Sequence, residues 1–254
     1  MVLAGCVTGG DASPIDATGE EALVISVADG DSLEVRSEAG AETVRLAGIN
    51  APDRGECHAD AARDNLAVLV EKTVRLVIVG SDQFGRTLAH VFHDEAHLNL
   101  DMVAAGLAIA SNPEDDPHGE AILFAEDRAY ATGVGLWGST ACGSSRVPPT
   151  VEIDESGSTV DPGGPDDRDL SDELIVLVNR GSESVDLSDW VLRDESSRHR
   201  YTFDDGTALG PGASVVITSA DPGWDPGDSP VWNNDGDMAL LQDASGTVVA
   251  RWRY

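Results

Sequence analysis

The stretch Asp29-Gly30-Asp31-Ser32, together with residues 45–53 (Arg-Leu-Ala-Gly-Ile-Asn-Ala-Pro-Asp), decides how the first half of this chain folds. Asp-Gly between two apolar runs is the strongest short-range signal for a β-hairpin. A second turn signal, Asp82-Gln83-Phe84-Gly85-Arg86, separates two further strand-like runs. Along the chain, these stretches supply two acids before a predicted strand (Asp29 and Asp31) and an arginine on a later strand (Arg45). Polar oxygens follow that strand at residues 50–53, and a second arginine, Arg86, follows Gly85.

The pattern around these motifs predicts a barrel. Apolar and polar residues alternate, or apolar residues cluster, in five strand-like segments, and three segments repeat their apolar residues with a helical period. The predicted strands are residues 21–27, 32–37, 42–46, 73–79 and 87–93, and the predicted helices are residues 60–71, 98–108 and 119–132. Five strands with interposed helices predict a small barrel of the OB type.

The second half changes character after residues 143–149, which read as a linker. Short strands separated by Gly, Pro, Asn and Asp turns predict a β-sandwich without helices. The predicted strands are residues 151–153, 173–178, 189–192, 200–203, 214–218, 238–242 and 248–252. We therefore expect a mainly β chain made of a tether (1–19), a barrel domain (20–142), the linker and a sandwich domain (150–254).

The charge of the chain is extreme. Its formal net charge is −30, and Lys72 is the only lysine among sixteen basic residues, yet 41% of the 254 residues are hydrophobic. This composition favours a salt-adapted protein whose self-repulsion is relieved by screening, and an acidic secreted protein is the alternative. In molar salt the Debye length falls to about 3 Å, so repulsion of a polyanion largely vanishes and binding depends on contacts at close range.

Three cysteines raise the question of processing. Val2-Leu3-Ala4-Gly5-Cys6 resembles a lipoprotein lipobox, in which Cys6 would be acylated and the polar residues after it would form a tether; a chance match is the alternative. If Cys6 is lipidated, Cys57 and Cys142 remain as an even pair that suits one disulfide, and two unrelated buried thiols are the alternative. The chain contains no apolar run long enough to span a membrane, so we expect membrane contact only through this lipid.

The first half resembles the staphylococcal nuclease (thermonuclease) family. Asp29 to Ser32 is similar to its DGDT motif, Arg45 to Asp53 to its RLxGIDTPE motif, and Asp82 to Arg86 to its DxYGR motif. Residues 106–108 and 135–137 are similar to later landmarks of that family. The resemblance covers roughly residues 21–142 and is specific because several separated motifs occur in order.

This resemblance implies Ca²⁺-dependent cleavage of DNA and RNA phosphodiesters. Asp31 would be the anionic metal ligand, Asn50 would ligate through its amide oxygen where the family most often has Asp, and Ala51 would offer its carbonyl. Arg45 and Arg86 would clamp the scissile phosphate and stabilise the charge that develops on it.

Other positions depart from the family pattern. Asp53 stands where the family has the Glu that orients the attacking water, and Glu56 is an alternative base if the loop bends back. Gln83 and Phe84 stand at positions that bind the terminal phosphate, where the family has a Tyr in place of Phe84. The shorter Asp53 side chain moves its carboxylate by about 1.5 Å, and a shift of that size can lower a rate about 100-fold.

The second half resembles a lamin-tail domain, an immunoglobulin-like sandwich. The similar stretches are residues 173–179, 185–194, 209–212 and 231–237. The pairing of the two domains is typical of exported microbial proteins. We therefore expect a monomeric extracellular or cell-surface nuclease of halophilic archaeal type, with DNA or RNA as its substrate and an unidentified ligand for the sandwich.

Each of these residues also has a purely structural interpretation. Asp29-Gly30 alone is most simply a turn, and a strand arginine in an acidic protein is most simply a salt-bridge partner. The histidines, such as His58, His90 and His118, show no metal-ligand spacing and read as solvated or structural. The tryptophans of the second half read as core and the acidic loops as solvated surface. The rival functions are a nuclease fold that binds without cleaving and a purely structural envelope protein.

Overall fold

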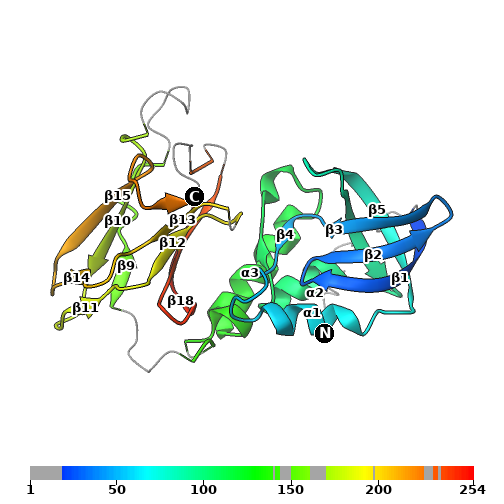
Figure 1. The fold of residues 1–254 in the computed structure, drawn as a ribbon, viewed down its shortest axis with the longest axis horizontal. Coiled ribbons are helices and arrows are strands. Elements are labelled where there is room, and N and C mark those ends of the chain that lie inside the picture. Colours follow the sequence, from blue (N-terminus) through cyan, green and yellow to red (C-terminus); the bar gives the residue numbers. More distant parts are fainter. Residues whose placement is uncertain are drawn as a thin grey trace, which may run out of the picture.

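The computed structural model describes residues 19–139, 141–143, 150–160, 170–196, 198–225, 231–233 and 236–254. Two β-rich domains lie side by side, with helix α3 between them (Figure 1). Cys6 of the predicted lipobox, the rest of the predicted tether up to residue 18, and residues 144–149 of the predicted linker fall outside the described residues. In the part of the chain that is described, no helix has the length and apolar character needed to cross a membrane.

The first domain is the predicted barrel, which the structure confirms. Its strands are Glu20–Asp29 (β1), Ser32–Ser37 (β2), Gly40–Leu46 (β3), Thr73–Ser81 (β5), Thr87–His93 (β6) and Ala96–His97 (β7). They form one sheet in the order β3-β2-β1-β5-β6-β7, and a parallel pairing of β3 with β6 closes the first five strands into a barrel. Val24, Val35 and Val44 are fully buried and the residues on either side of each are more exposed, because strand side chains alternate between the two faces.

Three helices cover this barrel. They are Ala59–Ala67 (α1), Leu98–Ala104 (α2) and Gly119–Thr132 (α3), with short 3₁₀ turns at Pro113–Asp115 (η1) and Gly135–Trp137 (η2). The bounds of α3 are those predicted, and α2, predicted within residues 98–108 with its end near Gly106, ends at Ala104. Gly106 adopts a φ of +64°, which ends the helical segment, and the next residues leave as a strand.

That strand belongs to a small ribbon that the sequence pattern did not predict. Ile49–Asn50 (β4) pairs antiparallel with Ile109–Ala110 (β8), so that Asn50 lies opposite Ile109. The amide of Ser111 extends the pairing by donating to the carbonyl of Gly48 at 3.0 Å. We call this two-stranded element the β4–β8 ribbon; it leads out of the barrel at the end of β3.

The second domain is the predicted sandwich. Its strands are Val151–Ile153 (β9), Leu174–Asn179 (β10), Val185–Asp186 (β11), Val191–Arg193 (β12), Arg200–Thr202 (β13), Ala208–Leu209 (β14), Ser214–Thr218 (β15), Trp224–Asp225 (β16), Met238–Gln242 (β17) and Val248–Arg253 (β18). One sheet has the order β15-β10-β9 and the other the order β16-β13-β12-β17-β18. Trp232 is buried in the core of this domain, as predicted, and Trp224 is buried beside it. Trp190 and Trp252, also predicted as core, are half-buried and pack against it.

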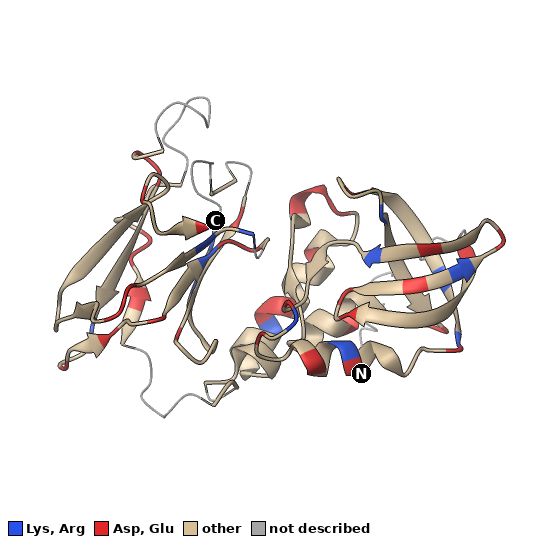
Figure 2. Cartoon of the chain, viewed as in Figure 1, with Lys and Arg blue, Asp and Glu red and all other residues tan. Residues whose placement is uncertain are grey.

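The two domains share an apolar cluster. Ile109, Leu136 and Trp137 of the first domain pack with Met238 and Leu240 of the second, and all five are buried. Acidic residues are spread over both domains in the same view (Figure 2). The two domains therefore meet through a shared buried apolar cluster, although the chain as a whole is strongly acidic.

Candidate active site

The register of the barrel brings the predicted phosphate and metal residues together. Ser32 on β2 pairs with Arg45 on β3, and Arg45 in turn lies beside Leu88 on β6. Arg86 therefore precedes β6 on the same side of the barrel as the Asp31-Ser32 turn. Residues 31, 45 and 86 are far apart in the sequence, and closure of the barrel places them at one end.

Asp31 is the buried acid of this site. Only 6% of the residue is exposed, and its carboxylate accepts hydrogen bonds from the backbone amide of Ala51 at 2.7 Å and from the Ser32 hydroxyl at 3.1 Å. Burial raises the pKa of Asp31 from 3.8 to about 6, against the lowering effect of Arg45. A buried carboxylate that gains from any nearby positive charge is suited to hold a cation.

Arg45 joins Asp31 to Asn50. One guanidinium nitrogen lies 2.6 Å from Asp31 Oδ2, and the other donates to Asn50 Oδ1 at 2.8 Å. The Asn50 amide nitrogen donates in the opposite direction, to the carbonyl of Glu195 in the second domain, at 3.0 Å. Two hard oxygens from different loops thus already face a single cationic group.

Arg86 is positioned by the turn in which it lies. Its Nε donates to Asp82 Oδ2 at 2.6 Å, and Asp82 Oδ1 accepts the backbone amides of Phe84 and Arg86, both at 2.9 Å. Gly85 completes this turn with a φ of +80°, a conformation that favours glycine. Arg86 Nη1 then reaches the Ser32 hydroxyl at 3.4 Å, so Ser32 links the arginine to Asp31. The importance of Asp82 was missed at the sequence level.

The remaining predicted residues are less closely gathered. Asp53 is exposed and, with Asp29, lines a cavity of about 190 Å³; among the contacts of the described residues, no hydrogen bond or ion pair joins its carboxylate to either arginine of the site. Phe84 is 76% exposed, with the Arg86 guanidinium 5.7 Å from its ring centre, and Gln83 is exposed beside it.

Glu56 does not have the free carboxylate that an alternative base would need. Its Oε2 accepts the backbone amide of Asp53 at 2.8 Å, and its Oε1 forms an ion pair with Arg200 of the second domain. The carboxylate therefore shapes the loop after Ala51 and links it to the second domain.

The donor set fits a hard divalent cation of modest affinity. Asp31 offers a carboxylate, Asn50 an amide oxygen and Ala51 a backbone carbonyl, which are the ligand types that Ca²⁺ accepts. Only one of these three ligands is charged. Another cluster, Cys57, His58 and Cys142, meets a purely geometric criterion for metal ligands, but its two sulfurs are bonded to each other.

The disulfide between Cys57 and Cys142 joins the loop before α1 to the end of the first domain, with the Cα atoms 5.6 Å apart. It also closes the segment that carries Asp53 and Glu56 onto the part of the chain that leads to the second domain. The three cysteines are thus divided into one bonded pair and Cys6, which lies outside the described residues.

Histidines from three elements form a group that sequence spacing did not reveal. His90 is fully buried; its Nδ1 lies 3.1 Å from His97 Nε2, and its Nε2 lies 3.2 Å from Asp116 Oδ1. His118 packs on the same rings, with centroids 4.3 Å and 4.8 Å away. Burial lowers the pKa of His97 to about 3 and also lowers the pKa of His118, and the packing of the three rings makes this group a structural cluster.

Comparison with known proteins agrees with this geometry. Residues 43–139 match the family model "Staphylococcal nuclease homologue", and residues 147–254 match the model "Lamin Tail Domain". An "Uncharacterized endonuclease" of Haemophilus influenzae is 36% identical over 116 residues, which are 45% of this chain and 64% of that relative. The "Thermonuclease" of Staphylococcus intermedius is 30% identical over 135 residues, 49% of this chain and 80% of that protein.

A second "Uncharacterized endonuclease", from Escherichia coli, is 30% identical over 131 residues, 50% of this chain and 81% of that protein. The nuclease-family model covers the part of the first domain that carries Arg45, Asn50 and Arg86, and the lamin-tail model covers the sandwich. The chain belongs to the staphylococcal nuclease family, with a lamin-tail domain after its nuclease domain.

Proposed function

We propose that this protein is a Ca²⁺-dependent nuclease that hydrolyses phosphodiester bonds of DNA or RNA. The names of its relatives support nuclease activity. The single observation that carries the proposal is the convergence of Arg45 and Arg86 on the Asp31-Ser32 turn, because two guanidinium groups beside a buried carboxylate match a phosphate and its metal ion.

Each residue has a distinct proposed role. Asp31, the amide oxygen of Asn50 and the carbonyl of Ala51 would hold Ca²⁺, which when bound polarises a phosphate oxygen and lowers the pKa of water. Arg45 and Arg86 would bind the remaining phosphate oxygens and stabilise the charge that grows on them. In the structure, Arg45 is held by Asp31 and Asn50.

The water-orienting role falls to Asp53. Its carboxylate is exposed at the cavity that it shares with Asp29, so it can reach a water molecule without first breaking a protein contact among those of the described residues. Glu56 holds the backbone of Asp53 in place rather than competing for this role. Gln83 and Phe84, exposed beside Arg86, are the proposed contacts to the substrate beyond the cleaved bond.

We further propose that the protein acts outside the cell, as a monomer, in high salt. The net charge of −30 favours a medium that screens repulsion from a polyanionic substrate, and the Cys57–Cys142 disulfide is typical of oxidising compartments. Lipidation of Cys6 would anchor it to the cell surface, and the lamin-tail domain would be its interaction module.

A binding module without catalysis is the second candidate. Two observations favour it: Asn50 leaves the metal site with a single carboxylate, and Asp53 makes no contact with Arg45 or Arg86 among the bonds of the described residues. Both candidates predict nucleic-acid binding, and only cleavage separates them.

The test is digestion of single- and double-stranded DNA in molar salt, with Ca²⁺ or with a chelator. We expect Ca²⁺-dependent cleavage that Arg86→Ala lowers about 100-fold or more, since it removes a stabiliser of the transition state. Arg36→Ala is the matched control, because Arg36 is an exposed arginine on β2 outside the site, and it should retain wild-type rates. DNA binding without cleavage by the folded wild type would establish the binding module instead.

A further inference from the structure

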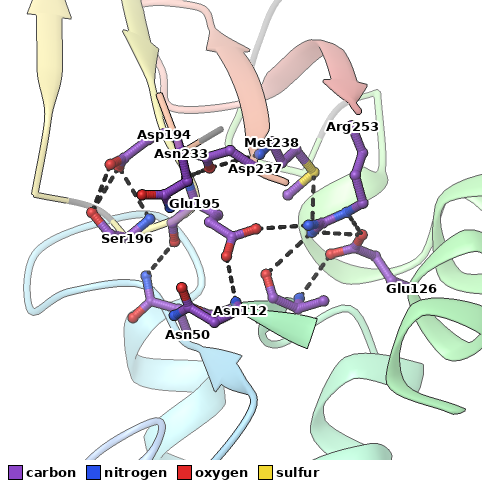
Figure 3. Close-up of polar contacts among 12 residues, drawn as sticks. Asn50, Asn112, Glu126, Asp194, Glu195, Ser196, Asn233, Asp237, Met238 and Arg253 are labelled. Carbon is purple, nitrogen blue, oxygen red and sulfur yellow. Dashed lines mark hydrogen bonds and ion pairs between the residues drawn. The ribbon is translucent and has the colours of Figure 1, made fainter. Parts of the chain in front are cut away.

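The second domain reaches the candidate metal site through the β4–β8 ribbon. Asn50 is the last residue of β4. Among the contacts of the described residues, it is the only side chain of the proposed metal site that bonds to the second domain. Its amide nitrogen donates to the backbone carbonyl of Glu195, which lies in the turn after β12 (Figure 3).

Glu195 is held in a fixed place. The residue is 1% exposed, and its backbone amide donates to the buried carboxylate of Asp237 at 3.4 Å. One carboxylate oxygen accepts the backbone amide of Asn112, just beyond β8, and the other lies 2.7 Å from Arg253 Nη1. The carbonyl that Asn50 meets is therefore part of a packed turn rather than of a loose loop.

Arg253 binds β8, the other strand of the same ribbon. Its Nη2 donates to the carbonyl of Ala110 at 3.2 Å and lies 3.2 Å from Oε2 of Glu126. Glu126 is fully buried and accepts the backbone amide of Ala110 through its other oxygen at 2.8 Å. The second domain thus contacts β4 through Glu195 and β8 through Arg253, and these two residues are bonded to each other (Figure 3).

This arrangement decides which end of the Asn50 carboxamide faces the site. A carbonyl oxygen accepts only from the NH₂ end, so the bond to Glu195 directs Asn50 Oδ1 to the opposite side, where it meets Arg45 at 2.8 Å. An aspartate at this position would place a carboxylate oxygen about 3 Å from the Glu195 carbonyl, with no proton between them. The amide at position 50 is thus matched to the second domain.

We propose that the lamin-tail domain is a positioning part of the nuclease site: through Glu195 and Arg253 it holds the β4–β8 ribbon and turns the Asn50 amide oxygen toward Asp31 and Arg45. This inference rests on the proposed function, since it assigns the second domain a role in the same Ca²⁺ site. Glu195 and Arg253 are positioning residues and act only through Asn50.

The test uses the full chain with Arg253→Gln and, as its matched control, Arg251→Gln. Arg251 lies on the same strand and also bonds to Glu126, at 3.1 Å, and its other contacts are with Asp127 and the rings of Tyr130 and Trp137. Among the bonds of the described residues, none joins Arg251 to the ribbon or to Glu195. The readouts are the Ca²⁺ Kd by calorimetry and the Ca²⁺ concentration for half-maximal cleavage, with circular dichroism and Tm to verify folding.

We expect Arg253→Gln to raise the Ca²⁺ Kd about tenfold, the usual effect of removing a group that orients a metal ligand, and Arg251→Gln to change it less than about twofold although both lower Tm. In an Asn50→Ala background, Arg253→Gln should change the Kd no further, because its effect passes through Asn50. If Arg253→Gln does not fold, Glu195→Gln takes its place with the same expectation.

Equal Ca²⁺ Kd values for Arg253→Gln and wild type, or additive effects with Asn50→Ala, would overturn the inference while leaving the proposed function intact. A wild-type protein that is folded but neither binds Ca²⁺ nor cleaves DNA would overturn both. The two failures are therefore distinguished by the wild-type measurement alone.

Discussion

Replacing Asp31 with asparagine should make the protein more stable and, at the same time, inactive. The carboxylate is 6% exposed, and burial raises its pKa from 3.8 to about 6 even though Arg45 lies 2.6 Å away. The folded state therefore binds a proton on this carboxylate more tightly than the unfolded chain does. Asparagine is a neutral side chain of nearly the same shape and keeps an oxygen that can accept from the Ala51 amide.

The size and sign of the effect follow from the pKa. Below pH 3.8 the acid is protonated in both states, and ionisation has no effect on stability. As pH rises from 3.8 to about 6, the unfolded chain loses its proton first, and the free energy of unfolding falls. At about 1.4 kcal/mol per pH unit the loss is complete above pH 6 and amounts to about 3 kcal/mol.

The assay is chemical denaturation of wild type and Asp31→Asn between pH 4 and pH 8, without Ca²⁺ and at constant high salt. We expect the variant to be more stable by up to about 3 kcal/mol at pH 8 and equal to wild type near pH 4. Asp64→Asn is the control, since its side chain is 69% exposed and should change stability by less than about 0.5 kcal/mol at either pH.

Ca²⁺ should reverse the order. At a thousand times its Kd, a ligand that binds only the folded state stabilises it by about 4.1 kcal/mol, which exceeds the advantage of the variant, and only wild type retains the anionic ligand. An Asp31→Asn protein that is no more stable than wild type at pH 8 would refute the reasoning. So would a gain that persists unchanged at pH 4, because it would not come from the ionisation of Asp31.

Three further outcomes test the supporting contacts. Asp82→Asn should lower kcat/KM about tenfold with little change in Tm, because it frees Arg86 from a 2.6 Å ion pair; unchanged cleavage would show that the turn alone positions Arg86. Glu126→Gln should lower the free energy of unfolding in urea by about 1.5–3 kcal/mol, since it removes a buried carboxylate that bonds to both Arg251 and Arg253, each of which keeps another acidic partner; a loss below about 1 kcal/mol would contradict this. Replacing both Cys57 and Cys142 with serine should lower stability by about 2–4 kcal/mol, and reduced wild type should show the same loss.

Strand periodicity was sufficient to predict the barrel. The alternation of Leu33 and Val35 with polar neighbours fixed β2 to its observed bounds, and the apolar repeat that includes Ile122 and Ala125 fixed α3. The two-residue strands β4 and β8 could not be predicted, because two residues show no period. The pairing of β4 with β8 is a tertiary contact between distant parts of the sequence, and it follows the turn of the chain at Gly106.

Sequence order also predicted which residues converge, though not how each is held. Asp31, Arg45 and Arg86 meet as expected because closure of the barrel is implied by the strands. The contact of Asn50 with Glu195 spans 145 residues, and no local pattern indicates it. The same holds for Glu56, whose sequence position favours a base and whose observed partner, Arg200, belongs to the second domain.

Salt is expected to act differently on the acidic surface and on the contact between the two domains. With a net charge of −30, repulsion between the two domains is screened by salt wherever the acids are exposed. Glu126 and Glu195 are instead buried against Arg253, where salt screens little, and the apolar contact of Trp137 with Met238 and Leu240 is indifferent to ionic strength. High salt therefore weakens the repulsion between the exposed acids of the two domains and leaves the buried ion pairs and the apolar contact in place. We expect the contact between Glu195 and Asn50 to persist at the ionic strength at which the acidic surface can approach a nucleic acid.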